Sequence, residues 1–413
     1  MDGASKVAVI GGGAAGFFAA LSAAEHHPSA RVVLFEKTAK LLSKVKISGG
    51  GRCNVTHHCF SPSALSKHYP RGGKQLKRGF DTFQASDTVA WFESRGVALK
   101  TEGDGRMFPT TDSSQTIIDC LLREADQRGV DIRLQASVQE LKPQPDGGFH
   151  LDGEPFEHVI VATGGSPKRS GFSWLESLGH TVSEPVPSLF TFNMPGEDVT
   201  ALMGVVVPDA LVRIQGTKLS QQGPVLITHW GMSGPAVLKL SAWGARDLAE
   251  RRYAFSIQIN WVGISNATEA AETMDAAVDE MRRKKVANAC PFELPKKFWA
   301  YLLERAEIPA DAVWLELGKK AKNKLLNTLL NDVYEVRGKT TFKEEFVTCG
   351  GVALDEVDFH TMQSRVVPGL YFAGEVLDVD GVTGGFNFQA AWTTGFVAGR
   401  LGLHSSEMAT FSA

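Results

Sequence analysis

The chain has few cysteines, and none has the spacing of a zinc ribbon. The five cysteines are an odd number without a CxxC pair, which indicates a reducing compartment and excludes a disulfide framework. The GxSxG motif of hydrolases and the HExxH motif of metalloproteases are also missing. The adjacent His57, His58 and Cys59 are too crowded to ligate one metal ion, and no partner pair lies elsewhere. We therefore expect no metal site.

The chain also lacks a long uninterrupted apolar run. An uncharged, mostly apolar stretch covers residues 7–24, and glycines interrupt it at positions 11, 12, 13 and 16. A membrane span needs about 20 predominantly apolar residues, and a signal peptide needs a basic amino-terminal region, where this chain has only Lys6. We expect no membrane segment, no export signal and a cytoplasmic protein. Internal repeats and low-complexity tracts are missing too.

What remains is the composition of an ordinary globular protein. The 413 residues are 43% hydrophobic and 22% charged, and their length suggests two or three domains. The net charge is only −3, but basic residues concentrate in residues 1–100 and 282–343, notably in RRKK (282–285) and KKAKNK (319–324). Such asymmetry indicates either a polyanionic partner or solvated helix faces. Nothing in the sequence predicts the oligomeric state.

The amino terminus has the pattern of a dinucleotide-binding unit. The segment KVAVIGGGAAGFFAALSAAE reads as a buried strand, a glycine turn and a helix, with GxGxxG at Gly11, Gly13 and Gly16. These glycines permit a tight turn, close approach to a pyrophosphate and close helix packing, and the helix start offers free N–H groups. The next strand, RVVLFEK, ends at Glu36, where an acid would hydrogen-bond ribose hydroxyls.

Three further segments favour FAD over NAD. KVKISGGGRCNVT (44–56) is a second glycine run, and HVIVATGGSP (158–167) reads as a buried strand that ends near a cofactor. The segment 369–400 reads as a strand, an acid at Glu375, a glycine-rich loop and a helix. The start of that helix would direct N–H groups at the flavin, where reduction places negative charge. The expected cofactor-binding residues are Gly11, Gly13, Ala14, Ala15, Gly16, Glu36, Lys37, Lys44, Ser48, Gly49, Gly50, Gly51, Arg52, Asn54, Thr163, Gly164, Gly165, Gly374, Glu375, Gly384, Gly385, Phe386, Asn387 and Phe388.

These motifs together resemble the YhiN-like family of bacterial flavoproteins, which includes aminoacetone oxidase-like enzymes. The matching segments are GGGAAG (11–16), SGGGRCN (48–54), GRMFP (105–109), ATGG (162–165), THWGMSGP (228–235), CGGV (349–352) and VPGLYFAGEVLDVDGVTGGFNFQAAWTTG (367–395). Two positions depart from the family: Cys349 replaces a smaller residue, and Phe386 stands where many members have tyrosine. The family is associated with FAD-dependent redox chemistry on small amines, unsaturated rings and uridine in ribosomal RNA.

The resemblance implies an α/β fold in which a Rossmann-like FAD-binding domain is interrupted by a β-barrel-like domain and a small helical subdomain. We expect the FAD-binding domain over 1–188 and 349–413, barrel strands over 189–262, helices over 263–335 and a return strand over 336–348. The middle of the chain fits this order. Alternating strands are expected at 205–216, 223–231 and 253–262, and helical patterns follow in ATEAAETMDAAVDEMRRKK, PKKFWAYLLERAEI and KLLNTLLNDVYEV.

Two residues are candidates for acid–base chemistry beside the flavin. His229, in THWGMSGP, could face a substrate, or it could be hydrogen-bonded in the barrel core. The thiol of Cys53 could donate a proton if the neighbouring Arg52 lowers its pKa, although a small packed residue is the stronger alternative. We expect Cys349 to be a residue packed in the interior, and we expect His57 and His58 to be exposed.

The sequence is consistent with three functions. The first is an FAD-dependent reductase that converts uridine in ribosomal RNA to dihydrouridine. The second is a small-molecule flavoenzyme, either an amine oxidase or an enoyl-type reductase, and the third is an FAD-stabilised binding module without turnover. The chain has no second GxGxxG, so NAD(P)H as electron donor would visit the flavin only transiently.

Overall fold

The computed structural model describes residues 5–341 and 347–403, and the chain divides into two compact units. The first unit contains residues 1–188 and 343–413, so it is built from both ends of the chain, and the second contains residues 189–342. Residues 1–4, 342–346 and 404–413 of the expected domains, including part of the expected return strand, lie outside the described residues.

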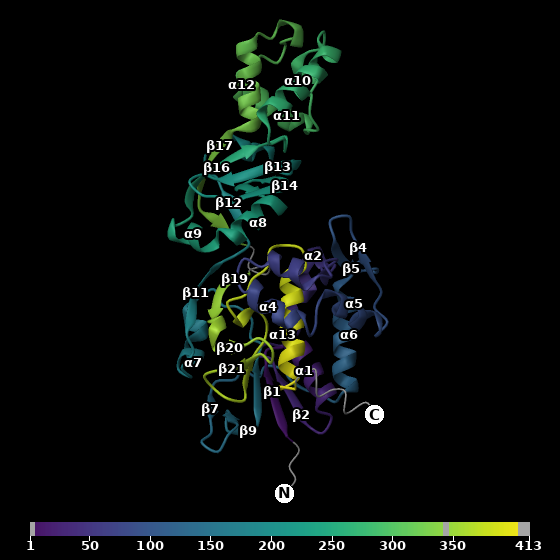
Figure 1. The fold of residues 1–413 in the computed structure, drawn as a ribbon, viewed down its shortest axis with the longest axis vertical. Helices are drawn as coiled ribbons and strands as arrows, with labels where there is room; N and C mark the ends of the chain where they lie inside the picture. The colour runs from purple at the N-terminus through teal and green to yellow at the C-terminus, as the bar shows by residue number, and fades with distance from the viewer. Residues whose placement is uncertain (1–4, 342–346, 404–413) are drawn as a thin grey trace. The chain divides into compact units, whose positions relative to one another are not determined.

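A seven-stranded sheet forms the centre of the first unit, in the order β20-β21-β22-β10-β1-β2-β6 (Figure 1). Its five strands from β22 to β6 are parallel neighbours, and residues 7–10 of β1 are buried, as expected for a strand in a parallel sheet. The strands are β1 (Lys6–Ile10), β2 (Arg31–Phe35), β6 (Asp131–Arg133), β10 (His158–Val161), β20 (Val357–Asp358), β21 (Gln363–Ser364) and β22 (Leu370–Phe372).

Helices and three small sheets complete this unit. The helices are α1 (Ala14–His26), α2 (Ser43–Gly51), α3 (Pro62–Leu65), α4 (Gly73–Phe80), α5 (Ala85–Glu93), α6 (Ser114–Gln127), α7 (Ser173–Glu176) and α13 (Phe386–Gly399). The small sheets are β3 (Thr56–His57) with β5 (Arg106–Pro109) and β4 (Leu99–Thr101), β7 (Leu141–Pro143) with β8 (Phe149–Leu151) and β9 (Glu154–Phe156), and β11 (Val182–Pro187) with β19 (Thr348–Val352).

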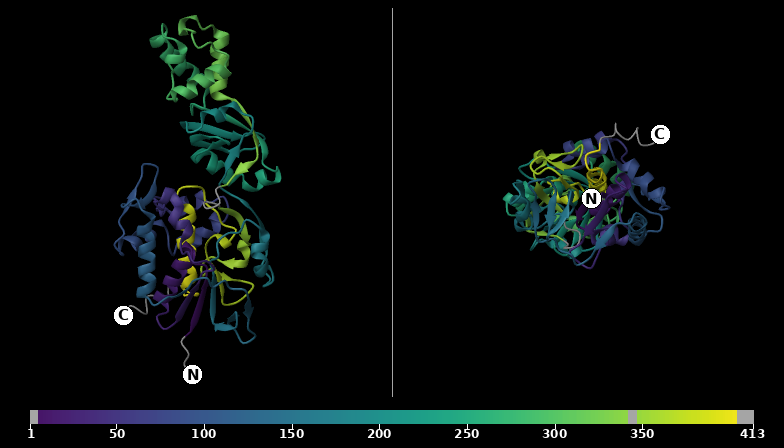
Figure 2. Two further views of the ribbon diagram at one scale, coloured as in Figure 1. Left: turned by 180° about the vertical axis from the view of Figure 1, so that it is seen from behind. Right: turned by 90° about the horizontal axis from the view of Figure 1, so that it is seen from below.

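The helices α1 and α13 pack against each other at backbone contact (Figures 1 and 2). A Cβ atom on Gly395 would lie 2.5 Å from the carbonyl oxygen of Ala15, and one on Gly399 would lie 2.4 Å from that of Ala19. The hydroxyl of Ser22 on α1 donates a hydrogen bond to the carbonyl of Phe396 at 2.7 Å. Small residues on both helices thus join the first and last helices of the chain.

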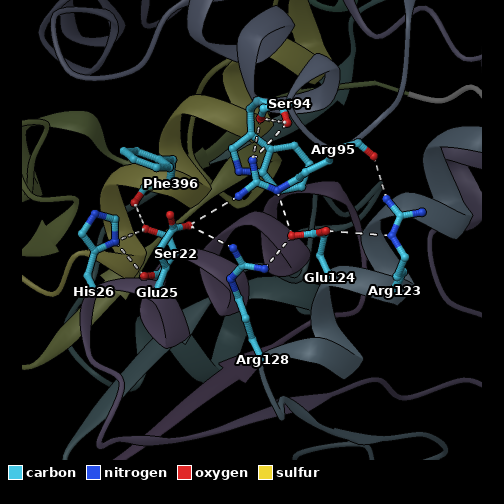
Figure 3. A network of polar contacts seen from close by, with 10 residues as sticks. Ser22, Glu25, His26, Ser94, Arg95, Arg123, Glu124, Arg128 and Phe396 are labelled. Carbon is cyan, nitrogen blue, oxygen red and sulfur yellow. Dashed lines mark hydrogen bonds and ion pairs between the residues drawn. The ribbon is translucent and has the colours of Figure 1, made fainter.

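An ion network ties α1 to the following helices (Figure 3). Glu124 on α6 is 6% exposed and accepts hydrogen bonds from Arg95 at 2.9 Å and Arg128 at 2.5 Å. The same two arginines lie 3.8 and 3.7 Å from the carboxylate of Glu25 on α1. Two carboxylates alternating with two guanidiniums compensate the burial of Glu124.

The sheet of the second unit has seven strands in the order β17-β16-β13-β14-β15-β12-β18. Its two outermost strands are consecutive in the chain, separated only by Gly338. The N–H of Gly338 bonds to Tyr253 at 2.8 Å and its carbonyl accepts from Asn193 at 3.1 Å, so one residue links the two edges of a barrel-like sheet. The strands are β12 (Thr191–Asn193), β13 (Val206–Ile214), β14 (Ser220–Thr228), β15 (Gly231–Ser233), β16 (Ala254–Asn260), β17 (Asp332–Arg337) and β18 (Lys339–Thr340).

A buried polar cluster anchors one helix of this unit, α11 (Lys296–Arg305), to its sheet. The other helices are α8 (Pro235–Trp243), α9 (Ala245–Glu250), α10 (Ala267–Met281) and α12 (Lys319–Leu330). Asp332 accepts hydrogen bonds from Trp261 at 2.9 Å, from Tyr334 at 2.5 Å and from Arg305 of α11 at 2.6 Å. Burial and the nearby carboxylate of Asp332 raise the pKa of Tyr334.

The structure corrects one expectation about this unit. The segment NDVYEV at the end of the third helical pattern is not helical, since α12 ends at Leu330 and β17 begins at Asp332. Residues 332, 334 and 336 are buried while 333, 335 and 337 are exposed, which is the period of a strand. Among the described residues, no helix combines the length and the apolar character that crossing a membrane requires.

We expect Gly395→Ala to destabilise the protein by about 1–3 kcal/mol, because the new methyl group would overlap the backbone of α1. In an open helix the same substitution would stabilise by up to about 1 kcal/mol. The free energy of unfolding, measured with urea, distinguishes the two cases. A variant as stable as the wild type would contradict the close packing of α1 and α13.

Candidate functional site

The first glycine turn brings bare backbone to the carboxyl end of the parallel sheet. Gly11 has a φ of 117°, and a Cβ there would lie 2.3 Å from the carbonyl oxygen of Ala162. A Cβ on Gly16 would lie 1.8 Å from the carbonyl oxygen of Gly11, whereas one on Gly13 would meet nothing within 4 Å. Gly13 precedes Ala14 at the start of α1, where no side chain caps the helix and no acid lies in the first turn. This open helix end can bind an anion.

Glu36 folds back on this turn. One of its oxygens accepts a hydrogen bond from the N–H of Gly12 at 2.9 Å, and the other accepts from the N–H and the hydroxyl of Thr38, both at 2.8 Å. The acid at the end of β2 therefore lies beside the glycine turn, as the sequence pattern requires. The neighbouring Lys37 is exposed.

A second cluster joins four distant segments of the chain. Lys44 forms an ion pair with Glu375 at 2.7 Å, and the other oxygen of Glu375 accepts from the N–H of Thr348 at 2.7 Å. A Cβ on Gly165 would lie 2.3 Å from the hydroxyl oxygen of Thr348. That hydroxyl is buried, and no described residue forms a hydrogen bond with it. Sequence reasoning missed Thr348, whose polar side chain in the apolar strand TCGGV was the available signal.

Glycines with left-handed backbone flank this cluster. Gly374 has a φ of 76° and packs against Ala15 of α1, since a Cβ there would lie 2.7 Å from the Ala15 methyl group. Gly164 also has a φ of 76°, and a Cβ on it would meet nothing within 4 Å. Thr163 before it is exposed.

The second glycine run interrupts α2. Ser48 has extended backbone, and Gly49, Gly50 and Gly51 have φ values of 57°, 69° and 84°. A Cβ on Gly50 or Gly51 would meet nothing within 4 Å. Successive backbone N–H groups in such a turn form a concave anion-binding surface.

The two glycine loops from opposite ends of the chain meet at the start of α13. With its amide oxygen toward Gly385, the side chain of Asn54 accepts from the N–H of that residue at 2.9 Å and donates to the carbonyl of Thr56 at 3.0 Å. A Cβ on Gly385 would lie 2.6 Å from the same carbonyl. Asn387 holds the loop from the other side, exchanging hydrogen bonds of 2.8 and 2.9 Å with the backbone of Gly381.

Aromatic rings gather at this helix start. Phe386 is stacked against His57, with ring centroids 4.7 Å apart, and against His68, at 4.2 Å. The hydroxyl of Tyr69 donates to the carbonyl of Phe386 at 2.7 Å. Gly384 precedes this turn with a φ of 130°, and Phe388 stacks on Trp392 within α13. His68 and Tyr69 were not among the expected site residues. The expectation that His57 is exposed was wrong, because its side chain is half-buried.

A buried ion pair fixes the segment before this loop. Asp380 is fully buried and forms a bidentate pair with Arg71, and the hydroxyl of Ser188 also donates to it. Burial raises the pKa of Asp380, while Arg71 opposes that rise. The two aspartates within the mostly apolar segment GEVLDVDGV were a signal that sequence reasoning did not use.

The structure corrects the expectation for Cys53. Its thiol is fully buried, and burial raises its pKa to about 12. The guanidinium of Arg52 lies over the ring of Phe108 and pairs with Glu102 at 2.6 Å, so it does not stabilise a thiolate. The expectation of a lowered pKa at Cys53 was therefore wrong. The structure supports the alternative, a small residue packed in the interior.

His229 lies in the second unit, in the two-residue turn between β14 and β15. It is exposed beside Trp230, whose ring centroid is 3.3 Å away and whose side chain is 42% exposed. The alternative of a histidine hydrogen-bonded in the barrel core is wrong, because the turn lies outside the sheet.

The first unit thus has the features that a long phosphate-bearing cofactor requires. The open sides of Gly13, Gly50, Gly51 and Gly164, the two uncapped helix starts and the hydroxyl of Thr348 all suit such a group. In the described part of the chain, no atom of another segment lies within 4 Å of the position that a Cβ would take on any of these four glycines.

We expect thiol reagents such as DTNB to modify Cys59 in the folded protein and to leave Cys53 intact below about pH 10. Cys59 is partly exposed, whereas the thiol of Cys53 is both buried and protonated at that pH. Peptide mapping by mass spectrometry after timed labelling measures both rates. Modification of Cys53 as fast as in urea would contradict its burial.

Comparison with known proteins gives this site its identity. Residues 5–401 match the model of the HI0933-like protein Rossmann domain. The chain is 32% identical to the ribosomal RNA dihydrouridine synthase of Escherichia coli, over 94% of this chain and 95% of that one. It is 28% identical to the 3-dehydro-bile acid delta(4,6)-reductase of Clostridium scindens, over 96% and 98% of the two chains.

A solved structure shares the fold. The 3-ketosteroid delta1-dehydrogenase of Sterolibacterium denitrificans superposes with a TM-score of 0.50 at 12% identity, covering 95% of this chain and 98% of that one. The expected resemblance, the Rossmann-like fold with additional domains and the FAD cofactor are confirmed. The chain belongs to the HI0933-like Rossmann family and is an FAD-dependent oxidoreductase.

Proposed function

We propose that this protein reduces uridine in ribosomal RNA to dihydrouridine, in the cytoplasm. The observation that carries the proposal is 32% identity, along almost the whole of both chains, with a ribosomal RNA dihydrouridine synthase. The reaction adds two electrons and two protons across one carbon–carbon double bond of the uracil ring. NAD(P)H would supply the electrons as a transient donor, since the chain has only one GxGxxG motif.

The residues of the first unit would hold FAD in an extended form. The open start of α1 would bind the pyrophosphate at Gly13. Glu36 would accept from the adenosine ribose through the oxygen bonded to Gly12, because that oxygen has a second lone pair. Lys44 and Glu375 would contact the middle of the cofactor. When bound, FAD supplies the two-electron transfer.

The start of α13 would stabilise the reduced state. Its first N–H groups carry partial positive charge. Among the described residues, only the side chain of Asn54 bonds to one of them, at Gly385. The aromatic stack of His57, Phe386 and His68 keeps this helix start rigid. A preorganised positive dipole favours negative charge without reorganisation when the charge develops.

We infer that His229 of the second unit is the proton donor. It is exposed, and an imidazole is the side chain that most often serves as a general acid in enzymes. Beside it, the exposed face of Trp230 would stack on a base. Cys53 would support the glycine loop and would not contact the substrate, because it is fully buried.

A small-molecule reductase is the second candidate. It is supported by the 28% identity with a bile acid reductase along nearly the full length of both chains. Such a substrate would need no basic surface. The RNA reductase and the small-molecule reductase would use the same FAD site. They would differ in the substrate that the second unit must recognise.

We expect Gly13→Val to abolish FAD binding and to leave the apoprotein folded. The backbone of Gly13 has a φ of −92°, which valine tolerates, and its Cβ would enter open space that the pyrophosphate needs. The purified variant should be colourless, with a circular dichroism spectrum like that of wild-type apoprotein. Gly16→Val is the matched control, because its Cβ would overlap the Gly11 carbonyl and should prevent folding. A yellow Gly13→Val protein with stoichiometric FAD would place the cofactor elsewhere.

We expect the purified holoenzyme with NADPH or NADH to form dihydrouridine in protein-free ribosomal RNA from a strain lacking the gene. Nucleoside mass spectrometry would show the product, and the same RNA before treatment with the enzyme should contain less dihydrouridine. Gly13→Val protein is the control for FAD dependence. Consumption of a 3-oxo-Δ4 steroid without any dihydrouridine would favour the small-molecule reductase.

A further inference from the structure

Two basic segments of the second unit, far apart in the sequence, lie side by side in the structure. The carbonyl of Arg282 accepts from the N–H of Leu315 at 2.8 Å, and that of Lys284 accepts from the N–H of Trp314 at 3.2 Å. The pairing continues as a bridge between Lys285 and Val313. Because residue 315 precedes α12 by only four positions, the segment 282–285 runs beside the start of that helix.

Buried tryptophans make this arrangement rigid. The indole of Trp314 donates to the carbonyl of Ala289 at 2.9 Å, and that of Trp299 donates to the carbonyl of Val286 at 2.8 Å. Both rings are 1% exposed. The backbone that carries the basic side chains of 282–285 and 319–320 is therefore held in a fixed position.

Several cations near the start of α12 have no ion-pair partner among the described residues. We name as the basic surface six exposed residues: Arg282, Arg283, Lys284, Lys285, Lys319 and Lys320. None of them forms an ion pair with another residue of the part of the chain that the structure describes, although Glu316 lies on the same segment. Lys322 and Lys324, one turn further along α12, are paired with Asp275 at 3.6 Å and with Glu307 at 2.6 Å.

The helix start adds to this charge. The first turn of α12 contains no acid, and no side chain caps its N-terminus at Gly318. Lys319 and Lys320 therefore stand at the positive end of a helix dipole, where cations lower the stability of the helix. Charge placed where it costs stability, beside uncapped N–H groups, suits a site for an anionic ligand.

We propose that the basic surface binds the phosphate backbone of the RNA substrate. This inference rests on the proposed function, because it names the part of the second unit that would recognise ribosomal RNA. The surface combines six cations with free helix N–H groups on a rigid scaffold. It binds RNA through phosphates with little sequence preference, and it leaves the choice of uridine to other residues.

The test compares two double variants on one helix. In fluorescence anisotropy with a labelled single-stranded RNA, Lys319→Gln/Lys320→Gln should weaken binding several-fold at low salt. Loss of two phosphate contacts should flatten the plot of log affinity against log salt by roughly 1.4. The matched control, Lys322→Gln/Lys324→Gln, removes the same charge from pairs that are already neutralised, and should change the slope by less than half as much. Equal effects of the two variants, or none, would overturn the proposal.

A third variant separates binding from folding. Lys319→Glu/Lys320→Glu places acids at the helix start and should raise the midpoint of thermal unfolding by roughly 1–4 °C while RNA affinity falls. A lower midpoint would mean that the lysines stabilise the fold, which contradicts the proposal. All three variants should retain the FAD spectrum.

The assay also separates this inference from the proposed function. Wild-type protein that forms dihydrouridine, with unchanged activity and salt dependence in Lys319→Gln/Lys320→Gln, would keep the function and reject the surface. Salt-dependent RNA binding lost in that variant, without dihydrouridine formation by the wild type, would keep the surface and reject the function. A wild type that binds no RNA would reject the surface.

Discussion

The first unit depends on contacts at which one backbone touches another without a side chain between them. Gly11 lies against Ala162, Gly385 against Thr56, and Gly395 against Ala15, and in each case a Cβ would come within 2.6 Å of a carbonyl oxygen. These contacts join segments from the amino-terminal part, the middle and the end of the chain. Because each is too close for any residue except glycine, the loops that would surround FAD are fixed by steric exclusion. The open sides of neighbouring glycines then become available to the cofactor.

Buried ion pairs are a second constraint, and they occur in both units. Asp380 with Arg71, Asp332 with Arg305, and Glu124 with two arginines are carboxylates that burial would penalise if they had no partner. Except for Glu124 with Arg128, which lie one helical turn apart, these pairs connect elements that are distant in sequence. The electrostatics of both units therefore favour one arrangement of segments over others of similar apolar burial.

The sequence predicted much of this fold and of the cofactor loops, because glycine patterns and strand periods are local signals. The strands β13, β14 and β16 lie within or close to their expected ranges, and α10 and α11 begin within a residue of theirs. NDVYEV was wrongly predicted to be helical for two reasons. Its alternation of buried and exposed residues begins directly after a helix, and an aspartate such as Asp332 is expected to be exposed unless its buried partners are known. The contacts of Thr348, His68 and Arg71 could not be predicted, since each pairs with residues more than twenty-five positions away. The wrong expectation for Cys53 had the same origin, because the partner that occupies Arg52 is Glu102.

The closure of the second sheet through Gly338 has a consequence for folding during synthesis. Strands β12 to β16 are made first, but both edges of their sheet await one short segment, β17 to β18, which emerges only after the three helices. Until then the growing chain presents two unpaired strand edges, a state that favours pairing with other chains. Ribosome pausing within residues 267–330 would prolong that state, so the soluble yield of this protein should depend on how quickly this part of the message is translated.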